Sequence, residues 1–84
     1  MPRGVKDTRY QRLLTVLINA RQKKGVPQSS LATQLGRPQQ FVSRYELSKR
    51  RLDVMEYVDV ATNLGLDPLS ELARILQKRS RTDI

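Results

Sequence analysis

Three pairs of glycine and proline divide this chain into short segments: Gly25 with Pro27, Gly36 with Pro38, and Gly65 with Pro68. Glycine permits left-handed backbone and proline lacks the N–H that continues a helix, so each pair marks a break in regular structure. Between the breaks, apolar residues recur at helical spacing and no strand-like alternation stands out. The sequence therefore predicts an all-α chain of five short helices with tight connections, and its 84 residues suffice for one modest core.

The five predicted helices lie within residues 8–25, 27–36, 37–47, 53–65 and 67–80. Asp53 and Asp67 are expected to act as N-caps, with Pro68 at the first position of the last helix. The residues expected to face the core in the last two helices are Val54, Tyr57, Val58, Ala61, Leu64, Leu69, Leu72, Ala73 and Leu76. The expected organisation is a flexible arm at 1–7, one domain at 8–79 and a flexible tail at 80–84.

The charge of the chain is high and unevenly placed. There are 16 Lys and Arg against 8 Asp and Glu, for a net charge of +8. Residues 1–51 carry a net charge of +10 and residues 52–73 carry −5. A small chain this basic usually meets nucleic acid, or less often a membrane surface. We therefore expect two different sides, of which the basic one binds a polyanion.

Several classes of function lack the residues that they need. The chain has no Cys and no His, so the commonest metal ligands and general bases are absent. We expect no enzyme, no metal, no cofactor and no small-molecule ligand. No apolar run approaches the roughly 20 residues of a membrane span, and the first residues do not resemble a signal peptide. The expectation is a soluble, cytoplasmic protein that does not bind membranes.

The second and third predicted helices meet at the sequence LGRP, with the spacing of a helix-turn-helix. At about 100° per residue, Phe41, Val42 and Tyr45 fall on one side of the third helix. The opposite side contains Gln39, Gln40, Ser43, Arg44 and Leu47. Amide, hydroxyl and guanidinium groups pair with base edges, and this side has no carboxylate. It is predicted to read DNA bases, whereas Phe41 either packs in the core or touches a thymine methyl group.

Residues 27–68, which include PQSSLATQLGRPQQFVSRYE and KRRLDVMEYVDVATNLG, resemble the lambda-repressor-like, Cro/C1-type (XRE) DNA-binding domains. The resemblance implies a compact five-helix domain and a bacterial or phage transcriptional regulator, such as a repressor, an activator or a controller protein. It also implies base contacts by Gln39, Gln40, Ser43 and Arg44. Two positions depart from the pattern: Pro38 replaces a frequent Ser or Thr cap, and Ser48 replaces a frequent Gly.

Phosphate contacts are expected beside the predicted reading helix. In the family a glutamine at the position of Gln28 bonds a phosphate, near a helix N-terminus that favours anions. Lys49, Arg50 and Arg51 follow the reading helix and are expected to meet phosphates, which positions a protein without reading sequence. For Arg51 a solvated charge is an equal alternative.

Arg21 and Glu46 are predicted to form a structural ion pair. Arg21 lies on the apolar stripe of the first helix, where a guanidinium needs a partner. Glu46 is the only acid in residues 25–51, and the family resemblance also implies the pair. The alternative is that Arg21 reaches solvent.

The chain is expected to form a two-fold homodimer on a near-palindromic operator in double-stranded DNA. Ile75 and Val60 lie off the apolar stripes of the last two helices, so they are predicted at the dimer interface. The two reading helices would then enter successive major grooves about 34 Å apart. The alternative function is an antitoxin-like or other protein-interaction module that works mainly through its C-terminal helix.

Overall fold

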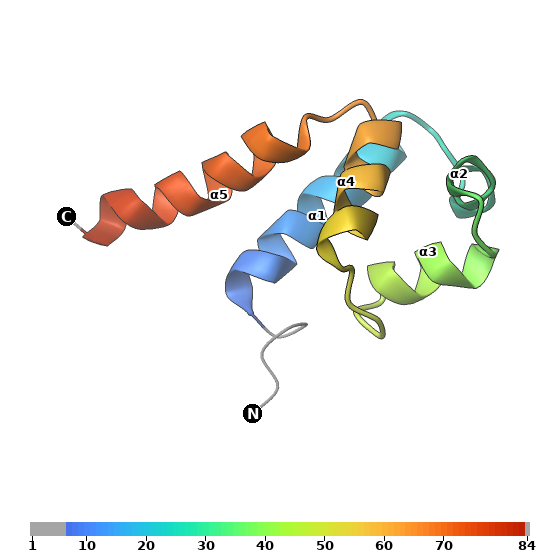
Figure 1. The fold of residues 1–84 in the computed structure, drawn as a ribbon, viewed down its shortest axis with the longest axis horizontal. Coiled ribbons are helices and arrows are strands. Elements are labelled where there is room, and N and C mark those ends of the chain that lie inside the picture. The colour runs from blue at the N-terminus through green and yellow to red at the C-terminus, as the bar shows by residue number, and fades with distance from the viewer. Residues whose placement is uncertain (1–6, 84) are drawn as a thin grey trace.

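The computed structural model describes residues 7–83, with side chains as far as Gln77. Within this range it contains five helices and no strand: α1 (Thr8–Lys23), α2 (Gln28–Leu35), α3 (Gln39–Glu46), α4 (Val54–Asn63) and α5 (Pro68–Asp83). α1 and α4 lie in the middle, α2 and α3 lie at one end, and α5 extends from the other end (Figure 1). The predicted all-α, five-helix architecture is confirmed. None of the described helices combines the length and apolarity that crossing a bilayer requires.

Aspartates start three of the helices. Asp7, Asp53 and Asp67 precede α1, α4 and α5, and each carboxylate accepts a backbone N–H of the first turn. At Asp53 this bond measures 2.7 Å, and the Glu56 carboxylate accepts the N–H of Asp53 in return at 3.0 Å. The reciprocal bonds form a capping box. They fix the start of α4 and also hold the Glu56 side chain at the end of the helix.

The turn between α2 and α3 depends on Gly36. Its φ of +69° lies in the left-handed region, where an L-residue with a side chain costs about 1–2 kcal/mol. The N–H of Arg37 closes α2 by donating to the carbonyl of Ala32 at 2.9 Å. α3 then begins after Pro38, which offers no side-chain cap. The sharp turn places α3 beside α2 as the second helix of a helix-turn-helix (Figure 1).

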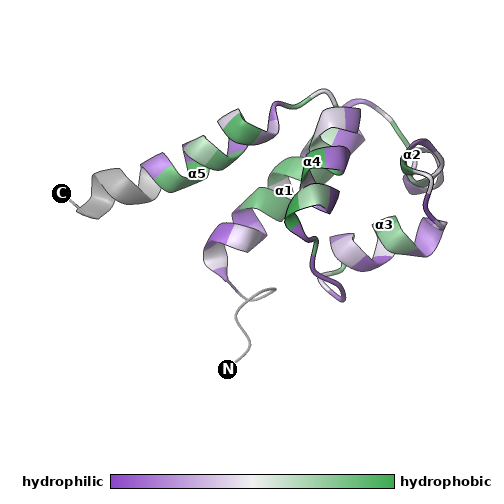
Figure 2. Ribbon diagram, viewed as in Figure 1, coloured by the Kyte–Doolittle hydropathy of each residue, from purple (hydrophilic) through white to green (hydrophobic). Residues whose placement is uncertain are grey.

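Four of the helices share one core, and Ile75 of α5 is buried outside it. The fully or nearly fully buried side chains of the core are Leu14, Leu17, Leu31, Ala32, Phe41, Val42, Tyr45, Tyr57, Val60, Ala61 and Leu64. In Figure 2 the apolar positions of α1 and α4 gather in the middle of the molecule, and α5 carries an apolar stretch away from it. The core therefore holds the buried side of α3 and leaves its other side outward.

Val60 is not available for a dimer interface. The sequence places it off the α4 stripe, yet its side chain is 0% exposed. Val54, which was expected to face the core, is 74% exposed instead. The reason is that α4 lies against both α2 and α5, so the buried side of the helix is wide and is shifted away from Val54. The prediction of Val60 as an interface residue was wrong.

The orientation of α5 also differs from the prediction. Ile75, expected at the centre of a dimer, is 7% exposed and lines hollows with residues of α1. Leu69, Leu72 and Leu76, expected in the core, are 77%, 37% and 45% exposed. Because α5 packs on α1 along one edge of its apolar stripe, Ile75 is buried and most of the stripe faces outward. Ala73, also expected in the core, is exposed as well.

The ends of the chain bear on the predicted boundaries. α5 continues to Asp83, through residues 80–83 for which the sequence predicts a flexible tail. Of the predicted flexible arm at 1–7, only Asp7 lies within the described residues, and it caps α1.

Candidate nucleic-acid interface

The two sides of α3 have opposite character. Phe41, Val42 and Tyr45 are 7%, 0% and 0% exposed and anchor the helix in the core. On the other side, Gln39, Gln40 and Arg44 are exposed and Ser43 is half-exposed. Among the described residues, none of these four polar side chains forms a hydrogen bond or ion pair within the chain. Their donors and acceptors are therefore directed at solvent from a rigid helix.

The polar side of α3 offers groups of a particular kind. Two amides each carry a donor and an acceptor, a hydroxyl carries both, and a guanidinium carries a planar set of donors. Side chains of this kind match the donor and acceptor patterns that base pairs present in a major groove. Leu47, at the C-terminal end of the same side, is 64% exposed and adds an apolar group. No carboxylate interrupts this side.

A hydrogen-bond network at Glu46 fixes the C-terminal end of α3. Arg21 on α1 donates from Nε and Nη2 to the Glu46 carboxylate at 2.7 and 3.0 Å. Its Nη1 donates to the carbonyl of Val26 at 2.8 Å, and Gln28 Nε2 donates to Glu46 Oε1 at 2.9 Å. The structure therefore brings Arg21 and Glu46 together, as the sequence suggests. Gln28 at the start of α2 joins them, which sequence reasoning did not anticipate.

The loop after α3 contains a strained residue. Ser48 has a φ of +62°, and within residues 7–83 it is the one non-glycine residue in the left-handed region. Its hydroxyl accepts a hydrogen bond from Gln11 Nε2 at 3.3 Å. The resemblance implies a frequent glycine at this position, and glycine adopts this conformation without steric cost.

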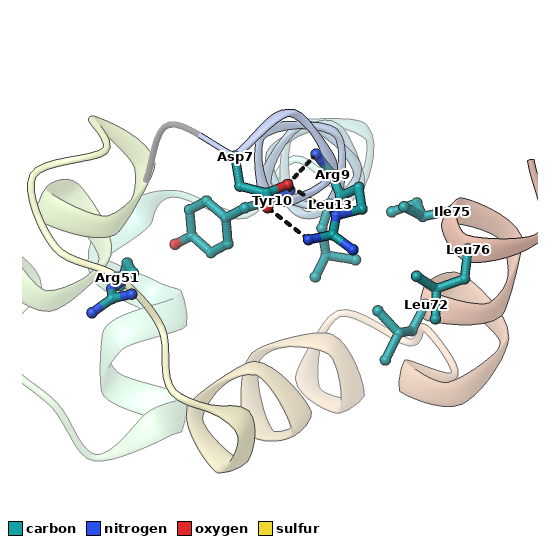
Figure 3. Close-up of a pocket in the computed structure, with 8 residues that line it drawn as sticks. All are labelled: Asp7, Arg9, Tyr10, Leu13, Arg51, Leu72, Ile75 and Leu76. Atoms are coloured by element: carbon teal, nitrogen blue, oxygen red, sulfur yellow. Dashed lines mark hydrogen bonds and ion pairs between the residues drawn. The ribbon is translucent and has the colours of Figure 1, made fainter. Parts of the chain in front are cut away.

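The basic residues that follow α3 do not form one patch. Lys49 is exposed in the loop. Arg51 is exposed near the start of α1, where it lines a hollow with Tyr10 (Figure 3). Arg50 turns instead to Glu56, to which Nη1 and Nη2 donate at 2.8 Å each. Of the three cations expected to contact phosphate, Lys49 and Arg51 are thus exposed and Arg50 is paired with a carboxylate.

Glu56 is a buried carboxylate that sequence reasoning missed. Besides Arg50, it accepts a hydrogen bond from Arg37 Nη2 at 3.3 Å. The hydrogen bonds from Arg50 lower the pKa of Glu56 to about 2, helped by the N–H of Asp53 and opposed by burial. The spacing of Asp53 and Glu56 is a capping-box pattern, so the sequence offered a signal for its place in α4 but not for its arginine partners.

A second exposed feature lies between α1 and α5. Figure 3 shows Tyr10 and Leu13 of α1 on one side of a hollow and Leu72, Ile75 and Leu76 of α5 on the other. A neighbouring apolar hollow runs from α1 towards Val54 of α4. The exposed side chains Leu69, Leu72 and Leu76 leave an apolar surface outside the core.

Comparison with known proteins decides the family. A solved structure described as an XRE-family like protein from Pseudomonas syringae pv. tomato str. DC3000 superposes with a TM-score of 0.82. The two sequences are 43% identical, and the match covers 88% of this chain and 90% of the other. The chain belongs to the XRE family. No family model matches the chain of this protein, and no curated protein matches it either.

Membership agrees with the geometry of the candidate interface. The α2–α3 pair is the helix-turn-helix of this XRE-family domain, and the resemblance read from residues 27–68 is confirmed. Among the described residues, no group of three or more acidic side chains is placed to hold a metal ion.

Proposed function

We propose that this XRE-family protein is a sequence-specific regulator of transcription that binds double-stranded DNA with α3 in the major groove. The observation that carries the proposal is the outward side of α3. It presents Gln39, Gln40, Ser43 and Arg44 on a helix whose other side is locked in the core. Side chains with these groups can tell base pairs apart, and a firmly held helix keeps their spacing fixed.

Phosphate contacts around α3 would position the helix. Lys49 is exposed after α3 and is proposed to contact the DNA backbone. Gln28 has one N–H engaged by Glu46, and an amide carries a second donor that remains for a phosphate. Arg51 is exposed and is proposed to contribute charge near the start of α1.

A homodimer through α5 would double the DNA contact. A single module of this size buries little DNA surface, and pairing two modules on a near-palindrome doubles it. We place the interface on Leu69, Leu72 and Leu76, because these exposed apolar side chains form one stripe.

The same stripe supports a second candidate function. An antitoxin-like or other interaction module would also present an apolar helix, with a different protein as its partner. The two functions differ in their response to DNA. An interaction module requires no sequence preference on α3, whereas a regulator requires one.

Selection from a pool of random duplexes tests the proposed function. We expect the purified protein to enrich one motif over successive rounds, in the form of two inverted half-sites about 10 base pairs apart, centre to centre. A pool that remains random after selection, from protein shown to be folded, would contradict the proposal and favour the interaction module.

A further inference from the structure

Two arginines from opposite ends of α3 converge on one carboxylate and one aromatic ring. Arg37 lies in the turn before α3 and Arg50 in the loop after it. Both donate to Glu56, Arg37 at 3.3 Å and Arg50 at 2.8 Å. Their guanidinium carbons also lie 4.5 and 5.0 Å from the centroid of the Phe41 ring. We call Arg37, Phe41, Arg50 and Glu56 the Glu56 cluster.

The Glu56 cluster contains more positive charge than is needed to compensate its one buried carboxylate. One buried carboxylate needs one well-placed cation, and the two-pronged contact from Arg50 supplies it. Arg37 adds a second positive charge through a longer bond, and its guanidinium donates no other hydrogen bond among the described residues. Both arginine side chains are 39% exposed, against 9% for Glu56. The cluster therefore keeps one net positive charge, with guanidinium groups open to solvent.

The cluster borders the outward side of α3. At about 100° per residue, Phe41 lies next to Arg44 and Gln40 at one edge of that side. Arg37 and Arg50 cover the ring of Phe41, so their guanidinium groups flank the proposed reading residues. When α3 lies in a groove, a flank of the helix faces the phosphates along the groove wall.

We propose that Arg37 and Arg50 together form a site that binds backbone phosphates of one DNA strand beside α3. Glu56 and Phe41 hold the two guanidinium groups in place. The inference rests on the proposed function and deepens it, because it names where the DNA backbone meets the protein. A planar guanidinium already fixed by stacking loses little freedom on binding phosphate. Sequence reasoning placed Arg50 near phosphate but did not find Arg37.

The test is the salt dependence of binding to a duplex of arbitrary sequence. Each phosphate neutralised by a cation steepens the plot of log affinity against log salt by about one unit. Arg37→Gln should therefore shallow the slope by about one unit per bound protomer. Arg37→Lys keeps the charge and should restore the slope of the parent. Thermal melting of each variant shows whether it is folded.

Arg12→Gln is the matched control, because it removes the same charge from an exposed position of α1 that faces α5. It should leave the slope unchanged. A slope for Arg37→Gln equal to that of the parent would overturn the phosphate site while leaving the proposed function standing. Equal losses in Arg37→Gln and Arg37→Lys would also overturn it, because the effect would then be structural. A parent protein that binds no duplex would instead contradict the proposed function.

Discussion

At the scale of single residues, Glu46 ties α3 to two other parts of the chain. It pairs with Arg21 of α1 and accepts a bond from Gln28 of α2. The side chains of Arg21 and Glu46 are only 12% and 7% exposed, so this pair is largely shielded from water. Removing one charge from a buried pair leaves the other without compensation, which is costlier than losing the pair itself.

We expect Glu46→Gln to lower the free energy of unfolding by about 3 kcal/mol, measured by urea titration. Glu71→Gln is the control, because its partner Arg74 is 67% exposed and a solvated pair contributes less than about 1 kcal/mol. Equal effects of the two substitutions would show that Arg21 reaches solvent when Glu46 is lost.

A substitution at Ser48 is expected to raise the free energy of unfolding. Its φ of +62° is a conformation that glycine adopts freely, so Ser48→Gly should relieve strain. The gain is offset by the loss of the 3.3 Å bond from Gln11 and by the greater freedom of glycine in the unfolded chain. We expect a net stabilisation of about 0.5–1 kcal/mol in thermal or urea unfolding.

Ser30→Gly, at an exposed helical position of α2, is the control for Ser48→Gly. It should destabilise the protein by about 0.5 kcal/mol, since glycine is a poorer helix former than serine. If both substitutions destabilise alike, the left-handed conformation of Ser48 carries no strain.

At the scale of elements, Glu56 connects the first turn of α4 to the turn before α3. Hydrogen bonds from Arg50 and other groups lower its pKa to about 2, from about 4.5 for an ordinary glutamate. A carboxyl group with a lowered folded-state pKa stabilises the protein above its unfolded-state pKa, and the contribution disappears as pH falls through the folded-state value. The contribution of Glu56 should therefore be complete above about pH 5 and be lost towards about pH 2.

Urea unfolding of the parent and Glu56→Gln at several pH values tests this linkage. The difference in unfolding free energy between the two proteins should shrink by about 2 kcal/mol on acidification from about pH 6 to about pH 2. Glutamine is chosen because it keeps the capping-box pattern. The lowered pKa values of Asp7 and Asp67 affect both proteins equally and cancel. Parallel profiles would mean that Glu56 has the same pKa in the folded and unfolded chain, and that Arg50 and Arg37 do not lower it.

The elements differ in how far the sequence determines them. Helix ends were predictable where local chemistry decides, as at Gly36 and at the caps Asp53 and Asp67. The sides of α3 were predictable because its apolar residues form one narrow stripe with polar residues opposite. The buried sides of α4 and α5 were not, because their apolar residues cover a wider arc and neighbouring helices choose which part is covered.

The candidate site shows the same division. Gln39, Gln40, Ser43 and Arg44 were identified from one helix, because periodicity alone places them outward. The meeting of Arg37 with Glu56 was beyond sequence reasoning, since the two residues are 19 positions apart and come together only when α4 packs against α2.

At the scale of the whole molecule, α5 buries one apolar side chain and exposes others at the proposed dimer interface. Ile75 packs on α1, so Ile75→Ala should lower the free energy of unfolding by about 2–4 kcal/mol.

Leu69 and Leu76 face outward, and replacing both with Gln should leave the unfolding free energy of the monomer nearly unchanged. The double variant should sediment as a monomer at micromolar concentration, while the parent sediments as a dimer. A parent protein that is monomeric both free and on its selected duplex would contradict the dimer.

The central claim is that the outward side of α3 reads base edges, and Arg44 tests it most directly. The measurement is the base preference at each position of the selected duplex, determined in parallel for the parent, Arg44→Ala and Lys49→Ala. Arg44→Ala should lose about 1–3 kcal/mol on the preferred site and relax the preference at one position of each half-site. Lys49→Ala should weaken all sequences about equally and leave every preference intact. An Arg44→Ala protein whose base preferences match those of the parent at every position would contradict the account.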